Sequence, residues 1–178
     1  MKETSYPIFE LFEKQWALVT AGSPEHFNCC TLSWGGMGTL WNRPVVTVYV
    51  HPARYTRGFL NMNDFFTISF FPEECRKSLG VLGTLSGRDG DKITPSGLSP
   101  VAMGKSVTYK EAELCFLCRK LYQHPFSRDD LDKDIQEYYQ AHPSVYPPDG
   151  NGDWQPHWVF VGEIVDSFDR RGDKQIDF

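Results

Sequence analysis

Six runs of β-branched and aromatic residues, bounded mostly by glycine, proline or asparagine, constrain the fold more than any other feature of the sequence. They predict strands over residues 16–22, 26–34, 44–50, 65–71, 106–124 and 157–169, and the fifth run is long enough to be bent or broken. Helices are predicted over 54–63, 73–82 and 127–142, the last with Ser127 or Asp129 as its N-cap and an end at Pro143. Because strands outweigh helices and do not alternate with them regularly, we expect a mainly β, antiparallel barrel or sandwich with a few peripheral helices.

Length and composition favour a single domain spanning residues 1–178. With 40% hydrophobic and 15% aromatic residues, the chain can bury a substantial core. The net charge of −5 argues against a nucleic-acid surface, which needs a clustered basic face. No apolar run approaches the roughly 18 residues of a membrane-spanning helix, so we expect no membrane partner.

The cysteines indicate a reducing compartment. Their number is odd, and their spacing is not that of a small disulfide-bonded domain: Cys29, Cys30, Cys75, Cys115 and Cys118. The segment MKETSYPIFELFEK also lacks the apolar core of a signal peptide. We therefore expect a cytoplasmic protein. Cys115 and Cys118 form a CxxC, but residues three apart in a strand point to opposite faces, so neither a redox pair nor a zinc site is predicted.

Several catalytic motifs are absent. The glycines of SWGGMGTLW fail the dinucleotide fingerprint, because Trp41 stands where a third glycine is needed and the following residues favour another strand. The sequence contains no HExxH, HxH or GxSxG, which argues against metal hydrolases and serine hydrolases. Of the five histidines, only His157 is kept as a candidate site residue.

Two segments have the composition of phosphate-binding elements. In NRPVVTVYVHPARYTRGFL, a strand ends at His51-Pro52 and delivers Arg54 and Thr56 to the first turn of a predicted helix, where free N–H groups favour an anion. The alternative is a solvated arginine beside a threonine helix cap. The loop TLSGRDGDKI adds Ser86, Arg88 and Lys92 around glycines, a second anion cradle. Together the two elements suggest a phosphorylated cofactor.

Taken together, these residues resemble the flavin reductase-like family of FMN-binding split barrels, which includes flavoredoxin-type proteins. The resemblance is carried by residues 28–56, 64–71, 82–93 and 157–165, which occur in the family's order. It implies a Greek-key split β-barrel, a homodimer, and one FMN per subunit at or near the dimer interface.

The resemblance also implies site residues. Asn28, Thr31, Ser33 and Trp34 match the strand and turn that hold the isoalloxazine and ribityl groups, and Arg54, Tyr55 and Thr56 match the phosphate-binding turn. Ser86 and Lys92 match a second ribityl or phosphate loop, and His157 matches the histidine that opens the last major strand. One residue departs from the family pattern: Cys30 stands where a methionine is expected, which changes the packing beside the ring and adds a thiol.

Three functions follow as hypotheses. The first is an FMN-dependent oxidoreductase that takes electrons from NADH, NADPH or another donor; FMN carries the chemistry, so no catalytic dyad is required of the protein. The second is a non-catalytic FMN-binding electron carrier or sensor without pyridine-nucleotide turnover. The third is a β-barrel module for another small ligand.

Overall fold

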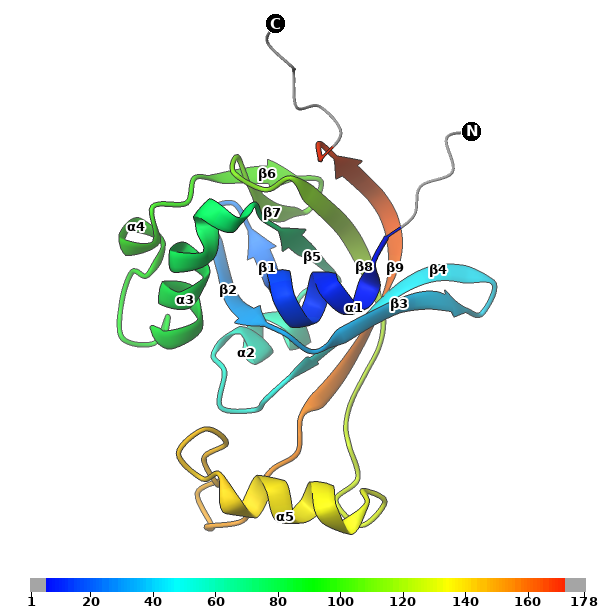
Figure 1. The fold of residues 1–178 in the computed structure, drawn as a ribbon, viewed down its shortest axis with the longest axis vertical. Helices are drawn as coiled ribbons and strands as arrows, with labels where there is room; N and C mark the ends of the chain where they lie inside the picture. Colours follow the sequence, from blue (N-terminus) through cyan, green and yellow to red (C-terminus); the bar gives the residue numbers. More distant parts are fainter. Residues whose placement is uncertain (1–5, 172–178) are drawn as a thin grey trace, which may run out of the picture.

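The computed structural model describes residues 6–171 and is built mainly from antiparallel strands, with a few helices around them (Figure 1). The strands are β1 (Ala17–Ser23), β2 (His26–Leu32), β3 (Gly35–Leu40), β4 (Arg43–Val50), β5 (Phe65–Phe70), β6 (Pro100–Met103), β7 (Ser106–Tyr109), β8 (Leu114–Pro125) and β9 (Trp158–Asp169). The helices are α1 (Ile8–Glu10), α2 (Thr56–Met62), α3 (Arg76–Thr84), α4 (Ile93–Ser96) and α5 (Lys133–Ala141), with a π-helical turn at Leu11–Gln15 and a 3₁₀ turn at Glu73–Cys75.

Seven strands form one sheet in the order β2-β1-β5-β8-β9-β4-β3, and β6 and β7 form a separate two-stranded ribbon. Every strand pair is antiparallel, as the sequence predicts. The order leaves β2 at one end of the sheet, and the candidate site lies beside it. No helix among residues 6–171 is long and apolar enough to cross a membrane.

The predicted strands all form, and the long run at 106–124 is broken as expected, into β7 and β8. The predicted start of the last helix is wrong. It begins at Lys133, and the carboxylate of Asp132 accepts a hydrogen bond from the N–H of Asp134. Ser127 and Asp129 are equally good capping residues by type, so residue type alone does not select the cap. The helical residues 8–15, α4, β3 and β6 were not predicted.

Strand β5 is buried on both faces, which accounts for its unusual number of phenylalanines. Phe66, Ile68 and Phe70 point into the main core, where Phe70 meets Phe12 edge-to-face at 5.4 Å. On the opposite face, the hydroxyl of Thr67 donates to the carbonyl of Val107 in β7 at 2.5 Å. The β6–β7 ribbon therefore covers this face within one chain, so the apolar strand by itself does not require a second copy.

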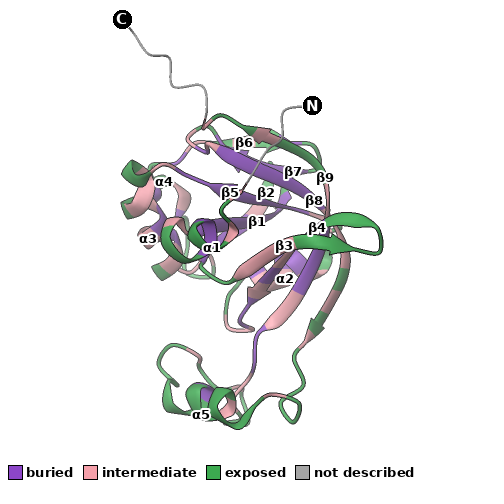
Figure 2. Ribbon diagram, turned by 45° about the vertical axis from the view of Figure 1, so that its right-hand side comes forward, coloured by how far each residue is buried: buried purple, intermediate pink, exposed green. Residues whose placement is uncertain are grey.

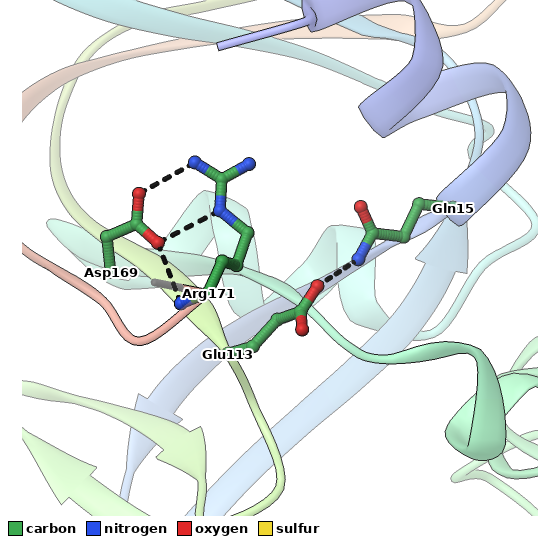
Figure 3. A network of polar contacts seen from close by, with 4 residues as sticks. All are labelled: Gln15, Glu113, Asp169 and Arg171. Atoms are coloured by element: carbon green, nitrogen blue, oxygen red, sulfur yellow. Dashed lines mark hydrogen bonds and ion pairs between the residues drawn. The ribbon is translucent and has the colours of Figure 1, made fainter. Parts of the chain in front are cut away.

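The ends of the described chain close against the β7–β8 connection (Figure 3). The amide of Gln15 donates to Glu113 Oε1 at 2.5 Å and to the carbonyl of Phe71 at 2.6 Å. Asp169 and Arg171 pair beside them, which holds the pKa of the Asp169 carboxyl below its usual value. The contacts of Gln15 tie the end of the helical residues 8–15 to Phe71 and to the β7–β8 connection.

Residues 126–157 form an insertion between β8 and β9 that carries α5 away from the barrel (Figure 1). Most of α5 is exposed, and Tyr139 is its buried residue (Figure 2). The insertion returns to the barrel at His157, so its aromatic residues reach the candidate site.

The cysteines of the described chain are all free. Cys115 packs in a small cluster with Met103 and Leu117, whereas Cys118 lies in the main core. Burial raises the pKa of both thiols, so neither resembles an activated redox thiol. The prediction that the CxxC is not a redox pair agrees with this packing, although both side chains are buried.

We expect the Cys115→Ser/Cys118→Ser double variant to keep any flavin reduction within a few-fold of wild type. Its stability should fall, because each buried hydroxyl costs about 1–3 kcal/mol when it lacks a partner. Thermal melts and anaerobic reduction of the same preparations test both statements. Lost electron transfer with folding and flavin content intact would restore the redox-pair interpretation.

Candidate functional site

Two connected cavities lie beside the edge strand β2. The larger, of about 350 Å³, is lined by Trp34, Tyr49, His51, Tyr146 and His157 and is called here the aromatic cavity. The smaller, of about 70 Å³, is lined by Arg54, Tyr55, Thr56, Ser86, Gly87 and Lys92 and is called here the polar cavity. Both are lined by Cys30, Arg54 and Thr84, so they form one elongated site with two chemically different ends.

Strand β2 offers main-chain hydrogen-bonding groups to this site. The carbonyl of Cys29 accepts from Lys92 Nζ at 2.5 Å, so it points away from β1. Main-chain groups of successive residues point alternately to the two edges of a strand. The N–H and carbonyl of Thr31, two residues after Cys29, therefore point to the same outer edge of β2 as the Cys29 carbonyl. No strand of residues 6–171 pairs with that edge. A planar ligand in the aromatic cavity can therefore hydrogen-bond to Thr31 as a neighbouring strand would.

The turn after β4 presents donors to the polar cavity. Its main-chain hydrogen bonds run from Arg54 N to His51 O and from Arg57 N to Arg54 O. Among the described residues, none accepts from the N–H of Tyr55 or Thr56. The Arg54 guanidinium donates to the carbonyl of Gly83 at 2.6 Å, and Thr56 makes no side-chain cap. Thr56 therefore does not cap the helix, and Arg54 is exposed at the cavity while it is held by Gly83.

The loop 84–92 closes the other side of the polar cavity. Arg88 fastens this loop to the turn, because its guanidinium donates to the carbonyl of Ala53 at 2.8 Å. Lys92 is 5% exposed, and its ammonium lies among the carbonyls of Cys29, Leu82 and Leu85. Arg54 and Lys92 line the polar cavity and no described carboxylate does, so it favours an anion.

Asn28 provides a buried donor beside this loop. The residue is 5% exposed, its Oδ1 accepts from the N–H of Cys29 at 2.8 Å, and its Nδ2 has no partner among residues 6–171. A Cβ on Gly87 would lie 2.7 Å from this Nδ2, so the loop packs tightly against it. Buried amide donors are rarely left without a partner, so Asn28 is an unusual, unsatisfied donor packed behind the Gly87 loop.

Two histidines form the polar edge of the aromatic cavity. Burial lowers the pKa of His51, and it lowers the pKa of His157 to about 3, with His51 and Arg54 adding to the effect. Both imidazoles are therefore neutral near pH 7. The rings of Trp34 and His157 lie 4.7 Å apart. No cluster of His, Cys, Asp and Glu among the described residues has the arrangement of a metal site.

The sequence profile of the Flavin reductase like domain matches residues 9–175. This chain belongs to the flavin reductase-like family. The match covers nearly the whole chain, as the resemblance of its segments implies. A sequence search of curated proteins gives no match.

Solved structures identify the fold of this flavin reductase-like protein. An FMN-binding protein from Thermus thermophilus, with bound 1-cyclohex-2-enone, is 20% identical to this chain, with a TM-score of 0.66. The match covers 97% of this chain and 81% of the Thermus thermophilus chain. Flavoredoxin from Methanosarcina acetivorans is also 20% identical with a TM-score of 0.66, covering 96% and 76%. A proposed flavin reductase with a split barrel domain from Shewanella frigidimarina is 14% identical with a TM-score of 0.66, covering 96% and 76%. The fold is thus a split β-barrel, as the resemblance implies.

Within this flavin reductase-like protein, the residues singled out from the sequence come together. Thr31, Ser33, Trp34 and His157 line the aromatic cavity, Tyr55, Thr56, Ser86 and Lys92 line the polar cavity, and Arg54 lines both. There are two exceptions. Asn28 lies behind Gly87 rather than on a cavity wall, and Arg88 does not line the polar cavity, because its guanidinium binds the carbonyl of Ala53 instead.

Sequence reasoning missed Tyr49, His51 and the aromatic residues of the insertion. Tyr139 and Tyr146 reach the site although they lie far from β2 in the sequence, and the Tyr146 ring lies 5.4 Å from both His51 and His157. The density of tyrosine and tryptophan between residues 138 and 158 is the signal that could have identified them.

Proposed function

We propose that residues 1–178 form a single FMN-binding oxidoreductase domain, which transfers electrons from NADH, NADPH or another donor through FMN to an acceptor. The observation that carries this proposal is the joining of a cationic cavity to an aromatic one at Cys30 and Arg54. FMN has the same two-part chemistry, with a phosphate at one end and a planar ring system at the other.

The polar cavity suits the phosphate end. The Arg54 guanidinium, the N–H groups of Tyr55 and Thr56 and the Ser86 hydroxyl would hold the phosphate, because charge-assisted and main-chain donors are the usual ligands of such groups. Lys92 supplies a second positive charge to the polar cavity.

The aromatic cavity suits the ring system. When bound, FMN supplies the hydride chemistry, and the protein supplies binding, orientation and electrostatics. The main-chain edge at Thr31 would orient the polar edge of the ring, and Ser33, Trp34 and His157 would line its sides. A neighbouring apolar groove of about 820 Å³ also contacts Ser33, Trp34, Tyr49 and His157.

The visible spectrum of the purified protein, with the released flavin identified by chromatography, tests cofactor binding. Anaerobic mixing with NADH and with NADPH then tests turnover, and we expect rapid bleaching of the oxidised flavin band. Bleaching by dithionite but by neither nucleotide would instead support the electron carrier or sensor. A colourless protein that takes up no FMN would support a module for another ligand.

We also propose a homodimer. The apolar groove is lined by Phe9, Phe12, Met37, Phe126 and Ile135, and Phe9 is 88% exposed. A contiguous apolar surface of this kind marks an interface more often than a free surface, and a second copy would cover it beside the cofactor. Sedimentation in the presence of FMN should give a dimer at micromolar concentration, and a monomer there would contradict this proposal.

A further inference from the structure

Tyr139 connects the insertion to His157 through its hydroxyl. The hydroxyl oxygen lies 2.5 Å from His157 Nδ1, and it accepts a hydrogen bond from the main-chain N–H of His157 at 3.3 Å. The Tyr139 ring stacks on Trp154 at 5.5 Å with a 19° interplanar angle. Two contacts from a buried, stacked side chain thus fix one edge of the imidazole.

These contacts select one tautomer of His157. The Tyr139 oxygen accepts a hydrogen bond from the main-chain N–H of His157, which leaves the hydroxyl proton of Tyr139 free to be donated to Nδ1. Nδ1 then acts as the acceptor and must be the unprotonated ring nitrogen. If Nδ1 carried the proton instead, the Tyr139 hydroxyl proton would face no acceptor among the described residues, and a buried donor without a partner is costly. The remaining proton of the neutral imidazole is therefore on Nε2.

The groups around the imidazole leave Nε2 available. His51, at the end of β4, accepts from the N–H of Ala53 at Nδ1 and contacts the carbonyl of Gln155 through Nε2, at 3.2 and 3.0 Å. It therefore has no acceptor to offer its neighbour. Tyr146 packs against His157 through its ring, and Arg54 adds positive charge. Burial, with His51 and Arg54 adding to the effect, lowers the pKa of His157 to about 3, so the ring stays neutral.

We propose that Tyr139 is a positioning residue that holds His157 as the neutral Nε2–H tautomer, so that an N–H donor faces the ligand in the aromatic cavity. The ligand group that this donor fits is a ring carbonyl oxygen. The inference rests on the proposed function for the identity of that ligand, but the tautomer itself is a property of the protein alone. The insertion therefore has a function at the site, through one hydroxyl.

Nitrogen-15 NMR of histidine-labelled, full-length protein without FMN tests the tautomer. We expect wild-type His157 to show an unprotonated Nδ1 and a protonated Nε2 from pH 6 to pH 8. Tyr139→Phe should populate the Nδ1–H form and move the two nitrogen shifts toward each other, because Nδ1 loses its donor. Tyr138→Phe is the matched control, since its hydroxyl lies 3.5 Å from that of Tyr146 and makes no hydrogen bond to His157.

A protonated Nδ1 in the wild type overturns the proposal without any variant, and so do unchanged shifts in Tyr139→Phe. Both outcomes are independent of whether the protein reduces flavin. Titrations with FMN and riboflavin then test the ligand contact. We expect Tyr139→Phe to raise both dissociation constants together by roughly 2- to 10-fold, as for one neutral hydrogen bond. Altered shifts with unchanged affinity for both flavins would show that Nε2–H does not face the ligand.

Discussion

Replacing Arg54 with alanine will weaken FMN binding by about 10- to 100-fold and leave riboflavin binding nearly unchanged. The reason is that a charge-assisted contact to a desolvated anion contributes about 1.5–3 kcal/mol, and riboflavin has the same ring without the phosphate. Arg54 lines both cavities, so the comparison of the two flavins separates a phosphate contact from a general change of shape. Flavin fluorescence quenching measures both affinities.

Two variants control this experiment. Arg88→Ala removes a nearby guanidinium that contacts Ala53 and does not line the polar cavity, so its effect on FMN should be clearly smaller. Thr56→Val should weaken FMN less than Arg54→Ala, because one neutral hydroxyl is lost. Equal weakening of FMN and riboflavin by Arg54→Ala would mean that the turn shapes the barrel through Gly83 and does not bind phosphate.

Replacing Gly162 with alanine will destabilise the fold by about 1–3 kcal/mol, the usual cost of overpacking a core. A Cβ at this position would lie 2.5 Å from the Phe66 ring and 2.6 Å from Cys118 Cβ. Since β9 lies between β8 and β4 in the sheet, the strand cannot move away without disturbing both neighbours. Each kcal/mol should lower the melting temperature by about 2–4 °C for a domain of this size.

Gly38→Ala is the matched control, because a Cβ there meets no atom within 4 Å and the residue is exposed in β3. Its melting temperature should stay within a degree or two of wild type, as for most exposed substitutions. Similar losses in the two variants would indicate that glycine flexibility in strands, and not the contact with Phe66, decides stability.

Local patterns in the sequence identified most strands, because β-branched and aromatic runs between glycine and proline favour the extended backbone wherever they lie. They failed at the start of α5, where Ser127, Asp129 and Asp132 are all suitable caps. The choice among them depends on where Tyr139 must lie to pack on Trp154 and reach His157, which are tertiary contacts. The local patterns also did not reveal what covers β5, whose far face packs against the β6–β7 ribbon.

The sequence by itself determined that a turn at residues 54–56 and a loop at residues 86–92 have the composition of phosphate-binding elements. Only the tertiary structure decided that they face one cavity, because the link between them depends on the order of the strands and on the position of α3. The same holds for Tyr139 and His157, 18 residues apart and joined at 2.5 Å. Residue type and local spacing encode what a segment can bind, and the packing of distant segments decides which of those groups meet.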